Sequence, residues 1–364
     1  MTVTIPGDEA EIFKAVRHDD ISMMRNQVKL NVDMNILHTG KECMIKSLRL
    51  SRNIRLIEYS PLIVAVIHSK LETIDWLVNN EASINMCEGS QRTPLHLAVA
   101  TGRADVVQYL ITKGAELNCQ TKSLRTPLLE AVDVNSPLIV DMLIKAGANL
   151  DLEDIKGTTP LLDATFQIGK MHRNKQLNVE IVKLLIAGGC NVNKTNNLLG
   201  TPLMMAVGSK SSELIEILLN AGANINQVDN KKRTAFHLVV EHDKMTRMAL
   251  LLLQKGASLN TKDSSGKTPI QNAVKFGKFE MIKFLIHADC QYDEELINSE
   301  RMKYLCSVVP VFGSWLKYEL ETVKSLQRLC RLSIKNATPT EQLKNIPTLD
   351  IPVSLIDYLM YKSG

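Results

Sequence analysis

A short motif recurs along this chain at nearly constant spacing, and this period constrains the fold more than any other feature. Each copy has Ser or Thr first, Pro or Ala second, a large apolar residue third and Ala or Val sixth. The seven copies begin at Ser60, Thr93, Thr126, Thr159, Thr201, Thr234 and Thr268. Four of the intervals are 33 residues, one is 34 and one is 42. Such a period is typical of stacked repeats, which present a long surface and favour binding of another macromolecule over catalysis.

Each copy predicts a short helix followed by a second one. Ser or Thr is a good N-cap, and Pro suits the first helical position because no backbone donor is needed there. A later apolar stretch ends at a Gly that suits a left-handed residue, as at Gly114, Gly147, Gly222 and Gly256. Short polar residues then begin the connecting turn, and we expect their side chains to bond their own backbone. These residues are Asn118, Asp151, Asn193, Asn226 and Asn260.

The motif, the period and the Gly-Ala ending together resemble the ankyrin repeat family over residues 60 to about 293. The signature is complete from Thr93 to Ala98 and partial in the other copies. The resemblance implies an all-α solenoid of about seven helix-turn-helix repeats joined by hairpin turns. His96 and His237 occupy the histidine position of the motif. The resemblance therefore implies a hydrogen-bonded structural role for both histidines, and not a metal or catalytic site.

The bulk composition argues against several classes of function. Basic residues number 43 and acidic residues 39, so the net charge of +4 is too balanced to indicate nucleic acid binding. The seven cysteines are scattered without a Cys-x-x-Cys pair, which suits a reducing compartment and predicts no zinc site. No phosphate loop, metal spacing or nucleophile motif is present, so we expect no enzyme activity and no cofactor. We also expect no membrane span and no signal peptide. The cytoplasm is the predicted location, with the nucleus left open.

The segment before the repeats, residues 1–59, departs from the period. Residues 9–35 predict a divergent capping repeat, with one apolar side and a turn at 33–35. The apolar residues are Ile12, Phe13, Ala15, Val16, Ile21 and Val28. Residues 36–59 are rich in Lys and Arg, and they predict either a basic contact with a partner or a solvated loop or hairpin.

The interval of 42 residues contains nine residues more than the usual period. The additional segment, around residues 167–176, is polar and basic. Insertions in repeat proteins map to loops, often on the binding face. We therefore interpret it either as a partner contact or as an ordinary loop, and we expect it to be mobile.

The chain changes character again after residue 293. Residues 294–322 predict a connector or cap, since they carry several large apolar side chains. In the next segment Leu326, Leu329, Cys330 and Ile334 share one helical face. Pro352 can then open a final helix with apolar residues.

Residues 323–364 resemble a SOCS box, which implies a small helical module. The resemblance implies that the Elongin-binding residues are Ser325, Leu326, Leu329, Cys330 and Ile334. It implies that the cullin-binding residues are Leu349, Ile351, Pro352, Leu355, Tyr358 and Leu359. Asp350 stands where the family has Pro, so the cullin-binding segment departs from the family pattern.

The whole chain thus resembles the ankyrin repeat and SOCS box family. The resemblance implies a non-catalytic adaptor of a cullin–RING ubiquitin ligase. Its partners would be Elongin B and Elongin C, a cullin (cullin-5) with its RING subunit, and a substrate protein held by the repeats. Two alternatives stay open at this stage. The first is an interaction scaffold whose C-terminal helices are only a cap, and the second is an enzyme with an unrecognised site.

Overall fold

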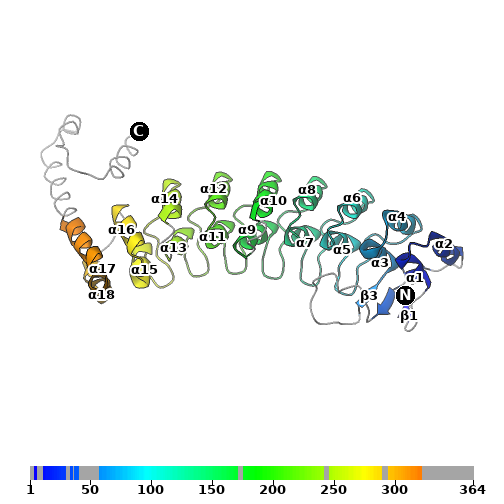
Figure 1. Cartoon of the computed structure of the whole chain (residues 1–364), viewed down its shortest axis with the longest axis horizontal. Helices are drawn as coiled ribbons and strands as arrows, with labels where there is room; N and C mark the ends of the chain where they lie inside the picture. The colour runs from blue at the N-terminus through cyan, green and yellow to red at the C-terminus, as the bar shows by residue number, and fades with distance from the viewer. Residues whose placement is uncertain are drawn as a thin grey trace, which may run out of the picture. The chain divides into compact units, whose positions relative to one another are not determined.

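The computed structural model describes residues 4–5, 11–29, 33–35, 37–40, 57–170, 175–241, 246–288 and 294–321 (Figure 1). These residues are helical apart from three short strands and the connecting turns. The chain divides into two compact units, residues 1–230 and residues 231–364. Each unit is described by itself.

Five helix pairs follow one another in the first unit and form the predicted repeats. The first helices are α3 (Pro61–His68), α5 (Pro94–Ala100), α7 (Pro127–Asp133), α9 (Pro160–Lys170) and α11 (Pro202–Gly208). The second helices are α4 (Leu71–Asn79), α6 (Ala104–Thr112), α8 (Pro137–Lys145), α10 (Lys175–Ala187) and α12 (Ser212–Asn220). Each first helix packs against the first helix of the next repeat, so the core runs continuously through the stack. The predicted all-α solenoid is confirmed.

The local signals in the motif act as the sequence predicted. The Oγ1 atom of Thr126 accepts a hydrogen bond from the backbone N of Leu129 at 3.3 Å, and Pro127 occupies the first helical position. At the end of α6, Gly114 has φ of +83°, a left-handed conformation that favours Gly. Glu81 takes the corresponding place after α4 with φ of +69°.

The polar residues that begin the connecting turns bond differently from our prediction. Oδ1 of Asn118 accepts from the backbone N of Asn149 at 2.8 Å, and Oδ1 of Asp151 accepts from the backbone N of Asn191 at 2.9 Å. Both acceptors therefore bind the neighbouring repeat and not their own turn. The prediction was wrong for these residues because the next repeat lies against the turn and offers its free backbone donors. Asn149 makes the local bond instead, accepting from the backbone N of Asp151.

The N-terminal segment contains a helix pair and a small sheet. Helices α1 (Glu11–Arg17) and α2 (Ile21–Lys29) pack together, and α1 packs on α3. The buried apolar residues of this pair are Ile12, Phe13, Ala15, Val16 and Met24. Strand β2 (Leu37–Gly40) pairs in parallel with β1 (Thr4–Ile5) and antiparallel with β3 (Ile57–Tyr59). The sequence did not predict β1, and the basic stretch at 41–56 lies outside the described residues.

The insertion in the fourth repeat of this unit is largely helical. Helices α9 and α10 contain 11 and 13 residues, whereas α7 and α8 contain 7 and 9. The added residues lengthen both helices, so the expectation of a loop is wrong for 167–170 and 175–176. Residues 171–174 lie outside the described part of the chain.

The second unit contains two further helix pairs and the connector helices. The pairs are α13 (Ala235–Val240) with α14 (Thr246–Gln254), and α15 (Pro269–Phe276) with α16 (Phe279–His287). They are followed by α17 (Glu294–Asn298), α18 (Glu300–Val308) and a helix over 310–321. Phe312 is 1% exposed and makes an edge contact with Phe279 at 5.1 Å between ring centroids. The connector therefore packs on the last repeat, although Tyr304, Val308 and Val311 are exposed. No helix in the described residues has the length and apolar character that crossing a bilayer requires.

Candidate partner-binding surfaces

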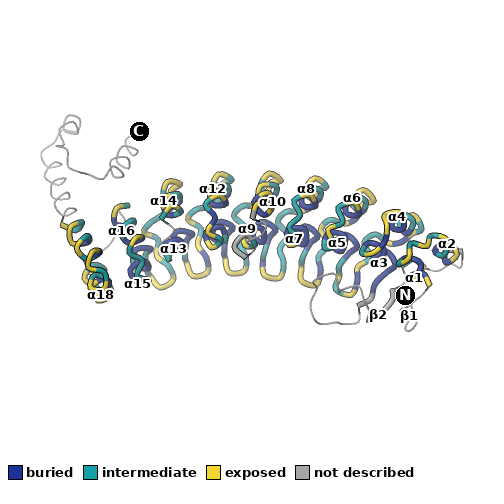
Figure 2. Tube along the Cα trace, in the orientation of Figure 1, coloured by how far each residue is buried: buried dark blue, intermediate teal, exposed yellow. Residues whose placement is uncertain are grey.

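The hairpin turns between helix pairs, called fingers here, lie side by side in the first unit. Their exposed residues are drawn in yellow in Figure 2. The backbone N of Ile155 donates to the carbonyl of Ser123 at 3.2 Å, and that of Asn197 donates to the carbonyl of Lys156 at 3.1 Å. These bonds join consecutive fingers into a continuous surface.

Gly157 is required for this close approach. A Cβ atom at Gly157 would lie 2.5 Å from Oδ1 of Asn197 and 2.8 Å from its backbone N, both in the next finger. Its φ of +70° also favours Gly. The fingers are thus held in a fixed register.

Large apolar side chains are exposed on three of these fingers. Leu124 is 44% exposed, Ile155 58%, Leu198 62% and Leu199 49%. Turns at the surface are normally polar, and adjacent exposed apolar residues mark surfaces that bind other proteins. Our sequence reasoning missed these residues, although an apolar residue at a turn position was a signal available in the sequence.

A charged cluster lies where the fingers meet the first helices. Arg125, at the base of its finger, is within 3.6 Å of Glu130 and 3.7 Å of Asp163, and it also contacts Asp133 and Asp154. Glu130 and Asp133 belong to α7, Asp163 belongs to α9, and Asp154 lies in the next finger. One guanidinium therefore contacts carboxylates from two successive repeats.

His96 has the structural role that the motif predicted. Its Nδ1 atom lies 3.2 Å from the backbone N of Thr93, and its Nε2 atom lies 3.1 Å from the carbonyl of Arg125 in the next repeat. Burial lowers the pKa of His96 to about 4, so the ring is neutral at physiological pH. The described residues contain no group of three or more His, Cys, Asp or Glu placed to hold a metal ion.

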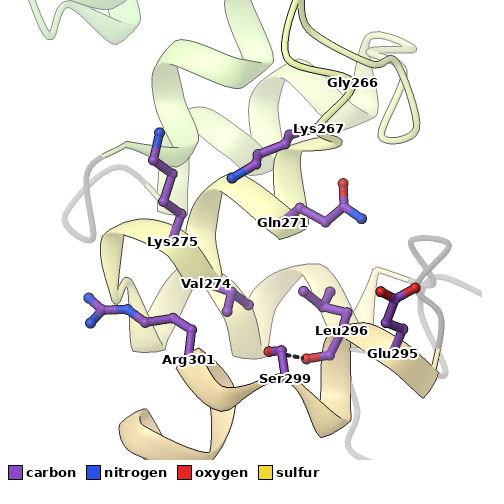
Figure 3. A pocket seen from close by; sticks show the side chains of 9 residues that line it. All are labelled: Gly266, Lys267, Gln271, Val274, Lys275, Glu295, Leu296, Ser299 and Arg301. Atoms are coloured by element: carbon purple, nitrogen blue, oxygen red, sulfur yellow. Dashed lines mark hydrogen bonds between the residues drawn. The ribbon is translucent and has the colours of Figure 1, made fainter.

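The second unit has an open cleft of about 520 Å³ between α15 and the helices α17 and α18 (Figure 3). Its charged lining residues are Lys267, Lys275, Glu295 and Arg301. Within the wall, Oγ of Ser299 donates to the carbonyl of Leu296 at 2.6 Å. The cleft is therefore mixed in charge, with an excess of cations.

The predicted Elongin-binding and cullin-binding residues, from Ser325 to Leu359, all lie outside the described residues. Their assignment stays a prediction from the sequence.

Comparison with known families supports the assignment of both the ankyrin repeats and the SOCS box. Profiles for ankyrin repeats match residues 62–111, 123–155, 171–263 and 203–296, which together make up more than half of the chain. A profile for the SOCS box matches residues 322–360. No curated protein matches the chain with statistical significance.

Solved structures support the ankyrin fold. The ankyrin repeat domain of Bcl-3, described as a member of the IkappaB family, is 26% identical and gives a TM-score of 0.56. It covers 63% of this chain, and the match spans 98% of that domain. The human ASB11 ankyrin repeat domain is 23% identical, with a TM-score of 0.52, and covers 65% of this chain and 100% of its own length.

Ankyrin repeats followed by a SOCS box fit a substrate adaptor of a cullin–RING ubiquitin ligase, and the repeats imply protein partners. The chain belongs to the ankyrin repeat and SOCS box family.

Proposed function

We propose that this chain recruits a substrate protein to a ubiquitin ligase built on Elongin B, Elongin C, cullin-5 and a RING subunit. The observation that carries the proposal is the SOCS box match at residues 322–360, directly behind the ankyrin repeats. The repeats hold the substrate, and the SOCS box holds Elongin C within the Elongin B–Elongin C pair.

The mechanism in this proposal is proximity. The bound substrate meets a ubiquitin-loaded conjugating enzyme at high effective concentration, which accelerates transfer without any new contact at the reacting atoms. The chain itself supplies neither a nucleophile nor a general base. Its contribution is to hold two partners on one molecule.

The Elongin contact in this proposal depends on one helical face. Leu326 enters an apolar pocket on Elongin C, and Cys330 lies one turn further along in a space too small for a larger side chain. The family's Elongin-binding motif is a small polar residue, Leu, three residues, Cys, three residues and an aliphatic residue. It supports this assignment, because Ser325-Leu326, Cys330 and Ile334 occupy each of its fixed positions.

Leu326→Ala should weaken Elongin B–Elongin C binding by roughly 10- to 1000-fold, because truncating a buried anchor commonly costs a few kcal/mol. Cys330→Phe should weaken binding by overpacking. Leu332→Ala is the matched control, since Leu332 is six residues from Leu326 and lies off the expected face. Calorimetric titration of each full-length variant with purified Elongin B–Elongin C measures the effect. Unchanged affinity in the Leu326→Ala, Cys330→Phe double variant would contradict the proposal and favour the interaction scaffold.

A further inference from the structure

The tips of three consecutive fingers have the same backbone structure. Tip 1 is residues 121–125, tip 2 is residues 154–158 and tip 3 is residues 196–200. The first side chain of each tip, Thr121, Asp154 or Asn196, accepts hydrogen bonds from the backbone N atoms two and four residues further on. Together with the backbone bonds between fingers, these bonds fix each tip in the chain by itself. A surface that is already ordered loses less conformational entropy when a partner binds.

Two of the tips carry Leu in a conformation that favours Gly. Leu124 and Leu199 are the fourth residues of tips 1 and 3, and both have φ of +57°. Tip 2 has Gly157 at the equivalent position, with φ of +70°. A bulky side chain is unfavourable in this left-handed conformation, and such strain is concentrated at functional sites. Burial does not compensate for it fully, since Leu124 is 44% exposed and Leu199 is 49% exposed.

The exposed apolar side chains continue from one tip to the next. Ile155 is 58% exposed, and its backbone N bonds to the residue before Leu124. Leu198 is 62% exposed, and the residue before it bonds to the residue after Ile155. The side chains are thus carried by backbone segments in direct contact. We call Leu124, Ile155, Leu198 and Leu199 the apolar strip.

The exposed charge on the same tips is positive. The charged residues of the tips are Lys122, Arg125, Asp154 and Lys156. Arg125 and Asp154 contact each other within the charged cluster. Lys122 and Lys156 are exposed, and neither forms an ion pair with a carboxylate in the described residues.

The charged groups beside the tips do not neutralise these two lysines. The carboxylate of Glu153 pairs with Lys194 at 2.7 Å. The buried Glu88 of the preceding finger and the buried Asp229 of the following finger are 8% and 7% exposed. The apolar strip therefore lies beside two exposed cations that have no carboxylate partner in the described part of the chain.

We propose that the apolar strip, with Lys122 and Lys156, binds a segment of a partner protein in which apolar side chains stand next to Asp or Glu. Apolar contact on the strip removes water from the interface, and the carboxylates of the segment complement the two lysines. A second copy of the chain fits poorly, because a symmetric contact would place the lysines of both copies in one interface without a carboxylate. Only the identification of this partner as the ligase substrate rests on the proposed function.

The first test uses the full-length chain and a displayed library of random 12-residue peptides. Peptides selected on the unmodified chain should be enriched in Asp or Glu with an apolar neighbour. The Lys122→Glu, Lys156→Glu double variant should select peptides enriched in Lys or Arg instead. A selected set without acidic enrichment, or selection of the same acidic peptides by the double variant, would overturn the inference.

Two matched pairs of variants test the apolar strip with a selected peptide. Ile155→Ser should weaken binding by roughly tenfold or more. Leu138→Ser in α8 should not, although Leu138 is equally exposed at 57% against 58% for Ile155. Leu124→Gly should also weaken binding and stay folded, because Gly favours the left-handed conformation. Gln91→Gly is its control, since Gln91 is an exposed polar residue with φ of +64° in the preceding finger.

The lysines have a control of their own. Lys122→Gln and Lys156→Gln should each weaken the peptide by roughly two- to fivefold, and the loss should shrink at high salt. Lys210→Gln should have no effect, because Lys210 is exposed in the turn between α11 and α12, at the other end of α11 from its finger. Equal binding by Ile155→Ser and the unmodified chain would overturn the inference. Self-association that is lost in Ile155→Ser would also overturn it, because the occupant would then be a second copy.

The result is separable from the test of the proposed function. Elongin binding should be unchanged in Ile155→Ser, and peptide binding should be unchanged in Leu326→Ala. Loss of Elongin binding by the unmodified chain with intact peptide selection would remove the ligase assignment and keep the binding surface.

Discussion

His96 and Asp163 are both buried ionisable residues in first helices, but their surroundings differ. The ring of His96 is bonded on both nitrogens, to its own turn and to the next repeat. Asp163 has one carboxylate oxygen without a donor. Burial is the main reason that the pKa of Asp163 is raised to about 6, with the charge of Asp133 adding to the effect. His96 is therefore a structural residue, whereas Asp163 reduces the stability of the chain in its free state.

The raised pKa predicts how stability depends on pH. Below about pH 4 the carboxyl of Asp163 is protonated in both the folded and the unfolded state, since the ordinary pKa is about 3.9. As the pH rises towards 6, the unfolded state loses this proton and the folded state retains it. The folded state therefore loses stability across that window, by about 3 kcal/mol for a shift of about two pKa units.

Asp163→Asn should remove this pH-dependent loss. The free energy of unfolding should rise by about 1–3 kcal/mol at pH 7.5, and by less at pH 4.5. Urea denaturation at the two pH values measures the difference, and Asp141→Asn, at a partly exposed carboxylate paired with Lys145, is the control. Equal destabilisation of Asp163→Asn at both pH values would show that the carboxylate is satisfied in the folded chain.

At the scale of elements, local signals determined how well the helices could be predicted. Ser or Thr caps and Pro at the first helical position act within one turn, so the repeats follow directly from the sequence. The charged cluster around Arg125 could not be found in this way, because Arg125 meets Asp154 and Asp163 only after two repeats have stacked. The bonding of Asn118 was misjudged for the same reason, since its acceptor serves the neighbouring repeat.

The insertion shows a further limit, because its polar composition indicated a loop where the structure has helix. Helix α10 begins at Lys175, three residues before Asn178. In neighbouring repeats the position of Asn178 is held by the N-caps Ser136 and Ser211, which accept from the backbone N of Ile139 and Leu214. Asn178 is instead inside the helix, 1% exposed, and its amide has no partner among the described residues.

Asn178→Leu should therefore stabilise the chain by about 1–2 kcal/mol, because it removes an unsatisfied buried amide at similar volume. Ser211→Ala should destabilise it by about 1 kcal/mol, since a true cap is lost. Thermal and chemical unfolding of both variants measures the contrast. Destabilisation by Asn178→Leu comparable to that by Ser211→Ala would mean that Asn178 still acts as a cap.

At the scale of the whole molecule, separate parts of the chain carry the features of separate tasks. The fingers and first helices of the first unit carry the exposed apolar residues and the charged cluster around Arg125. The SOCS box match lies at the other end of the chain, at residues 322–360. Changes in one part should therefore leave the partner of the other part bound. This independence is what a substrate adaptor requires.

Proximity labelling in cells tests whether the chain recruits Elongin B and Elongin C through residues 326 and 330 while it holds a substrate. The intact chain is compared with the Leu326→Ala, Cys330→Phe double variant, and labelled proteins are quantified by mass spectrometry. Elongin B, Elongin C and cullin-5 should be labelled only by the intact chain. Substrate proteins should be labelled by both forms and should be more abundant with the double variant. Equal labelling of Elongin B and Elongin C by the two forms, or by neither, would contradict the proposed adaptor function.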